Sequence, residues 1–234
     1  MTQLPNYWSL VEQQWRDYHL DSLLPHLNLT VKTQDWVATI AMHPDIVNGS
    51  NNSKLNVSRL LLRRLGEELR GVELLAANGH GFQAATAACN LFEQSHYLTY
   101  VGMDAANADA FVQWTDPYKS PISVRQLVNQ SGKARSWPQL RCDEEYEKYR
   151  FLCGFKHNNP VFQGILQLRT DPDAYLSQYA LAESAWCILS AVGLFAMLHL
   201  KPENTVAVLE QCNGLMDLAP PLFPKIDTRQ NTGL

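Results

Sequence analysis

Residues 53–79 read SKLNVSRLLLRRLGEELRGVELLAANG, and this stretch decides the fold class. Arginines and glutamates alternate with apolar residues that recur at steps of three and four, as on one face of an α-helix: Leu55, Leu61, Leu62, Leu65, Leu69, Val72 and Leu75. Asn78-Gly79 is a pair that typically ends a helix. The stretch therefore predicts a long amphipathic helix that buries one face against other elements.

Prolines mark where further long helices can form, because proline disrupts helix interiors. Residues 45–116, 139–159 and 173–201 contain no proline. Within them, residues 81–103 and 173–200 are rich in alanine and other apolar residues, which predicts helices inside a bundle. In chain order we expect helices at about 7–24, 53–77, 81–103, 105–114, 122–129, 143–156, 173–200 and 202–218.

Strand signals are sparse in this chain. Leu27, Leu29 and Val31 alternate briefly and residues 36–42 are ambiguous, so we expect at most one short hairpin. The sequence predicts an all-α helical bundle over residues 51–218, preceded by a helical appendage at residues 1–50. Residues 219–234 hold three prolines and no hydrophobic period, which predicts an extended tail.

Composition excludes several classes of protein. The chain has 234 residues, of which 46% are hydrophobic and 18% charged, so a globular protein is expected rather than a disordered one. Its net charge of −4 creates no overall positive field, so any nucleic-acid site must be local. The five cysteines form no C-x-x-C pair, which argues against a zinc ribbon or a disulfide framework and favours a reducing cytoplasm.

No membrane segment is expected either. The N-terminal residues contain no basic stretch that leads into an apolar run, so we expect no secretory signal. The longest uncharged apolar stretch, residues 184–198, is about 15 residues long. That is shorter than the roughly 20 residues that a membrane-spanning helix needs, so a buried core helix is the preferred interpretation.

Residues 146–160 read YEKYRFLCGFKHNNP and carry the candidate chemistry. Each helical residue advances by about 100°, so positions seven apart lie within about 20° of each other. Arg150 and His157 therefore share one stripe with Tyr146 and Cys153, while Phe151, Leu152 and Phe155 are expected to face a core. An arginine can bind a phosphate with two hydrogen bonds, and histidine as a residue type exchanges protons near neutral pH. The alternative is an ordinary solvent-exposed helix face, which shows the same pattern.

The local charge is compatible with a polyanionic partner. Residues 119–156 contain eight lysines and arginines and four acidic residues, the acids being clustered at 143–147. Lys156, beside His157, belongs to this basic excess and is a candidate binding residue together with Tyr146. A chain that is acidic overall thus has a modest basic excess around the stripe, which agrees with an RNA-facing patch.

The Arg-x6-His pattern at the end of a helix, followed by Asn158, resembles the signature of the HEPN superfamily of α-helical domains. The chain is also similar to a bacterial HEPN-like family of unknown function. In that family a helix of the type Ala87-Ala88-Cys89-Asn90-Leu91-Phe92-Glu93 is followed by aromatic residues, a short helix with a tryptophan, and a tyrosine–leucine–histidine segment. The matching positions here include Trp114, Tyr149, Leu152 and His157, and the resemblance covers roughly residues 55–200.

This resemblance implies a metal-independent endoribonuclease or an RNA-binding module of bacterial toxin or defence type, working as a homodimer in the cytoplasm. Arg150 would stabilise the phosphate, His157 would transfer protons at the ribose 2′-hydroxyl, and Asn158 would be a supporting polar group. Phe151 and Asn90 depart from the pattern, since a polar residue and an arginine are usual there. The alternative is a non-catalytic helical interaction or dimerisation protein with an unknown protein partner.

Two other candidate sites have weaker support in the sequence. Glu93-x-x-His96 is the helical motif of di-iron carboxylate proteins, but the chain has no second copy, so no metal is expected there. Cys153 lies beside His157 on the stripe, yet a buried unreactive thiol is the simpler interpretation. No phosphate-binding or dinucleotide-binding motif is present, and we expect no cofactor.

Overall fold

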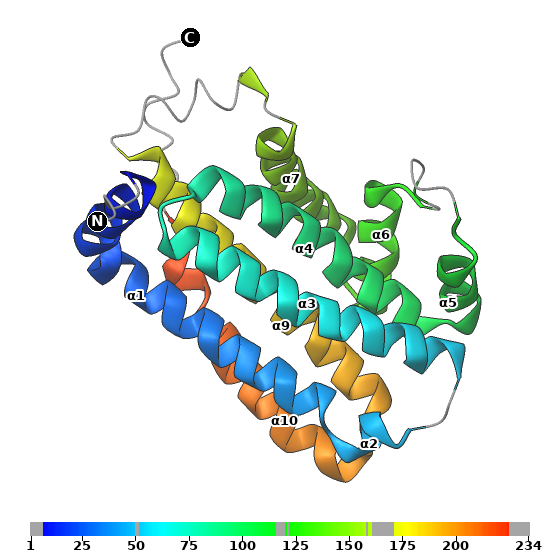
Figure 1. Ribbon diagram of the computed structural model, residues 1–234. Coiled ribbons are helices and arrows are strands. Elements are labelled where there is room, and N and C mark those ends of the chain that lie inside the picture. The colour runs from blue at the N-terminus through cyan, green and yellow to red at the C-terminus, as the bar shows by residue number, and fades with distance from the viewer. Residues whose placement is uncertain are drawn as a thin grey trace, which may run out of the picture.

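The computed structural model describes residues 7–49, 52–115, 120, 122–157, 159–160 and 171–224. Over these residues the protein is an all-α helical bundle without strands, so the predicted fold class is confirmed and the hairpin is not formed. Figure 1 shows helices α1, α3, α4, α9 and α10 running side by side, with α5, α6 and α7 along one flank. In chain order the helices are α1 Tyr7–Ala41, α2 Pro44–Val47, α3 Ser53–Ala77, α4 Gly81–Met103, α5 Ala105–Val112, α6 Val124–Ala134, α7 Gln139–Lys156, α9 Pro172–His199 and α10 Pro202–Met216.

Helix α9 is the central element of the core. It packs against α1, α3, α4 and α10, and twenty of its residues are buried. Its length, and the mean hydropathy of 1.8 over its most apolar 18-residue window, would suit a membrane span, but 78% of that window is buried inside the protein. Such burial on all sides is typical of the core helix of a bundle.

Helix α1 extends well beyond its expected end at residue 24, and Pro25 lies inside it. A proline removes one backbone hydrogen bond and distorts the turn before it. Tertiary packing offsets this cost, because the same helix buries Leu23, Leu29, Trp36, Val37 and Ile40. Most of these side chains join one core with those of α3, α4 and α9, so the described part of residues 1–50 shares the core of the bundle.

The start of the tail is folded onto the bundle instead of extending from it. Residues Pro220–Leu222 form a 3-10 helix, and His26 Nε2 on α1 donates a hydrogen bond of 2.8 Å to the Leu222 carbonyl. The Phe223 ring lies 6.1 Å from the Tyr179 ring of α9. Burial of such apolar groups outweighs the absence of a sequence period, and residues 225–234 lie outside the described part.

Helices α4 and α9 approach each other closely at their first turns, and a glycine permits it. A Cβ atom on Gly81 would lie 2.3 Å from the Asp173 carbonyl oxygen, which belongs to the backbone and cannot rotate away. Gly81→Ala is expected to lower the free energy of unfolding by about 1–3 kcal/mol. Gly71→Ala is the matched control, because nothing lies within 4 Å of its Cβ position, and it should raise stability by about 0.5–1 kcal/mol. Urea unfolding of both variants checks this, and equal shifts would contradict the close approach.

Candidate functional site

A groove of about 490 Å³ runs along the exposed face of α7. All four residues predicted to share a stripe line it: Tyr146, Arg150, Cys153 and His157. The remaining lining residues are Glu147, Tyr149, Phe151, Gly154 and Asn159. The groove thus combines a cation, an imidazole and several aromatic rings on one surface.

The groove exists because α7 buries its opposite face. Cys142, Glu145, Leu152 and Phe155 are buried, and α7 packs against α4 and α6. The helix begins at Gln139, four residues before the expected start. Phe151 was expected to face the core with Leu152 and Phe155, but it is only half-buried and also lines the groove.

Arg150 is exposed and held in a fixed direction by its neighbour one turn earlier. Its Nη1 donates hydrogen bonds of 3.0 and 3.1 Å to the two carboxylate oxygens of Glu147. These bonds and the negative charge of Glu147 raise the pKa of Arg150, which stays cationic. A phosphate could take the place of this carboxylate, since both are anions that can accept two hydrogen bonds from a guanidinium.

His157 is the residue that ends α7. Its backbone N–H donates a 3.0 Å hydrogen bond to the Cys153 carbonyl, and its side chain is exposed at the end of the groove. The backbone N–H of Asn159 closes the same turn on the Gly154 carbonyl at 2.9 Å. Asn158 lies outside the described residues.

Lys156 is turned away from the groove. Its Nζ lies 3.1 Å from Glu93 Oε1 on α4, and although burial works against the charged form, the Glu93 carboxylate raises the pKa of Lys156. His96 is buried, and its Nδ1 bonds to the Ser131 hydroxyl on α6. The two members of Glu93-x-x-His96 therefore bond to different partners instead of to one common centre.

Arg125 on α6 does not line the groove but contacts Tyr146, which does, and the sequence indicated Arg125 only as part of the basic excess of residues 119–156. Its guanidinium carbon lies 5.0 Å from the centre of the Tyr146 ring, and its Nη2 lies 2.9 Å from Asp143 Oδ1. The Tyr149 ring lies 6.0 Å from that of Tyr146 in a nearly parallel arrangement, with 29° between the planes. Only the packing of α6 against α7 brings Arg125 to this position, and no local spacing reveals that contact.

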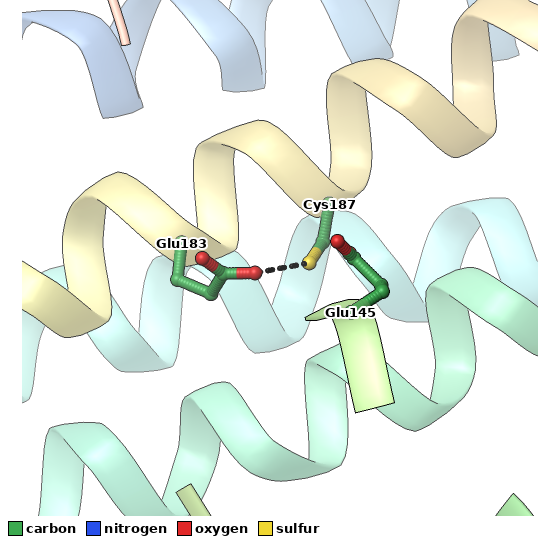
Figure 2. A group of neighbouring side chains, drawn as sticks. All are labelled: Glu145, Glu183 and Cys187. Carbon is green, nitrogen blue, oxygen red and sulfur yellow. Dashed lines mark hydrogen bonds between the residues drawn. The ribbon is translucent and has the colours of Figure 1, made fainter. Parts of the chain in front are cut away.

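A second group of chemically active side chains lies inside the bundle. Glu145 on α7 and Glu183 and Cys187 on α9 are buried, and one donor atom from each lies within 4.8 Å of the others (Figure 2). The Cys187 thiol donates a 3.3 Å hydrogen bond to Glu183 Oε1. Two carboxylates and a sulfur are a donor set that a transition metal could use.

The chain already supplies a cation to this buried group. Lys148 Nζ lies 3.3 Å from Glu145 Oε2 and 3.3 Å from Glu183 Oε1, and Arg141 lies 3.3 Å from Glu145. Burial raises the pKa of Glu183 despite Lys148, and raises that of the Cys187 thiol well above its ordinary value. A metal would have to displace the ammonium and remove the thiol proton, so the arrangement is best described as a buried ion-pair network.

Comparison of the chain with family models, with curated proteins and with solved structures found no match.

Proposed function

We propose that this protein binds RNA in the α7 groove and cleaves its backbone without a metal ion. The observation that carries the proposal is that Arg150, His157 and Tyr146 line one groove on the protein surface. Arg150 supplies a charge that can face a phosphate and His157 a group that can move a proton, while the Tyr146 ring can contact a base and so contribute to RNA binding.

The proposed reaction uses the ribose 2′-hydroxyl as nucleophile. His157 accepts the proton of that hydroxyl, the 2′-oxygen forms a bond to phosphorus, and the bond from phosphorus to the 5′-oxygen breaks. The 5′-oxygen takes a proton from water, and the other product ends in a 2′,3′-cyclic phosphate. Arg150 stabilises the negative charge that develops on the phosphoryl oxygens. Purified protein is therefore expected to cleave RNA in the presence of EDTA.

The resemblance to HEPN domains adds proposals about assembly and setting. We propose a cytoplasmic homodimer of bacterial toxin or defence type in which the α7 grooves of two copies meet. Such an arrangement would place two arginines and two histidines around one RNA strand. Sedimentation equilibrium of the purified chain measures the oligomeric state, and a strict monomer that cleaves RNA would contradict the dimer proposal.

Replacing Glu147 tests whether RNA binds in the α7 groove. Its carboxylate accepts a hydrogen bond from the Arg150 guanidinium and adds negative charge to the groove. Glu147→Gln is expected to tighten RNA binding about two- to fivefold at low salt, because an anionic competitor of the phosphate is lost. Fluorescence anisotropy with labelled RNA measures the effect.

Glu67→Gln is the matched control for that variant. Glu67 pairs with Arg63 at 3.0 Å on the exposed face of α3, and its replacement by glutamine removes the same formal charge. An equal gain from both variants would mean that overall charge, and not the α7 groove, governs binding.

A non-catalytic interaction protein is the second candidate, and one observation favours it. The Arg150 guanidinium already has a carboxylate partner, as a structural surface arginine would. RNA binding without cleavage in EDTA, together with a stable dimer, would support this candidate over the nuclease.

A further inference from the structure

We infer that the groove selects single-stranded RNA, because Tyr146 stacks on an unpaired base while Arg125 contacts the neighbouring phosphate. This inference rests on the proposed function and adds a substrate class and a binding residue from a second helix. It is carried by the contacts of Tyr146, whose ring neighbours one arginine and one aromatic ring.

The Tyr146 ring has a firm support on its protein side. Tyr149 packs nearly parallel to it, and the Tyr149 ring lies 5.6 Å from the ring of Phe92, which is fully buried on α4. Tyr146 itself is half-buried and lines the groove. A ring fixed in this way loses little conformational entropy when a base stacks on it.

The Arg125 guanidinium rests over the Tyr146 ring and is exposed to solvent. A stacked base would take over this position, since aromatic rings and guanidinium planes bind base faces in the same manner. The displaced guanidinium stays on α6 beside the groove, where it can pair with a phosphate in place of Asp143.

Base pairing prevents this contact. In a duplex both faces of an internal base are covered by its neighbours, so the base must leave the stack before a protein ring can reach its face. Tyr146 and Arg150 lie one helical turn apart, so a base on the ring and the phosphate of an adjacent nucleotide fall along the same face of α7.

Anisotropy titrations with three labelled probes test the inference: a single-stranded RNA, a duplex of the same sequence, and a single strand that has an abasic site at its centre. Wild-type protein should bind the single strand about tenfold more tightly than the duplex, and the abasic strand should bind less tightly than the intact one. Tyr146→Leu should weaken binding of the intact strand about tenfold and remove the difference between intact and abasic strands. Tyr146→Phe should retain binding, because it keeps the ring.

Two further variants complete the experiment. Arg125→Gln should lower the slope of log affinity against log salt by about one, as expected for one lost phosphate contact. Tyr18→Leu on α1 is the control, since Tyr18 is 83% exposed and lies outside the groove. Equal binding of single strand and duplex, or unchanged binding by Tyr146→Leu, overturns the inference and leaves the proposed function standing. Absence of RNA binding by the wild-type protein overturns both.

Discussion

RNA incubated in EDTA with the His157→Ala variant is expected to remain intact, whereas the wild-type protein is expected to cleave it. Removing a general base typically lowers a rate by about 100- to 10,000-fold, which would bring cleavage close to background here. The side chain of His157 is exposed, and its structural role at the end of α7 is played by its backbone N–H, which alanine retains. The loss should therefore occur in a protein that folds normally. Gel electrophoresis of end-labelled RNA, with thermal unfolding measured in parallel, checks both parts.

His80→Ala is the matched control for this prediction. His80 lies between α3 and α4, pairs with Glu12 at 3.0 Å, and does not line the groove, so its replacement should leave cleavage unchanged. The nuclease proposal fails if wild-type protein leaves RNA intact after long incubation. It fails equally if the two histidine variants cleave at the wild-type rate, because the activity would then come from elsewhere.

Lys148→Met is expected to cause the largest loss of stability, about 3–5 kcal/mol of unfolding free energy. The ammonium group lies between Glu145 and Glu183, both of which are only 1% exposed. Removing it leaves two buried carboxylates close together without their bridging cation, while methionine keeps most of the side-chain volume. Chemical denaturation at neutral pH measures the loss.

The pH dependence of the Lys148→Met variant provides an independent check. Burial raises the pKa of Glu183 above its ordinary value of 4.5 even with Lys148 in place, so the folded state holds the Glu183 proton more tightly than the unfolded state. Stability therefore falls as the pH rises from 4.5 through the raised pKa. Without the lysine this fall should become steeper and extend to higher pH. A variant whose stability rises over the same range would contradict the buried ion-pair network.

Lys156→Met is the matched control for Lys148→Met. Lys156 also pairs with a glutamate on a neighbouring helix, at 3.1 Å, but both side chains of this pair are partly exposed. An exposed pair contributes about 0–1 kcal/mol, because water and salt screen it. Comparable losses in the two lysine variants would show that burial has no special effect at Lys148.

The individual helices were predictable because the signals that define them, the hydrophobic period and the positions of proline and glycine, lie close together in the sequence. The period of residues 53–77 and the proline and glycine positions located α3 and α4 at their observed limits. Tyr146, Arg150 and His157, which their spacing predicts on one face of the helix, line the same groove. In both cases the information lies within a few turns of one helix.

The features that depend on distant residues were not predictable. Pro25 signals a helix end, and only the packing of α1 onto the bundle core carries the helix past it. In the sequence, Glu145 and Lys148 resemble the charged residues of any exposed helix. Their role depends on Glu183, which follows Lys148 by 35 positions and is brought beside it only by the fold. Arg125 likewise contacts Tyr146 of the groove only through the packing of α6 against α7.

The two opposite sides of helix α7 have different roles. Lys148 pairs with Glu183 of α9 on the inner side, while Arg150 and His157 are exposed on the outer side. Substitutions on an exposed helix side usually alter stability by no more than about 0.5 kcal/mol. The outer side can therefore acquire new ligand preferences through successive substitutions without unfolding the domain, so that binding and stability can evolve independently on the same eighteen-residue helix.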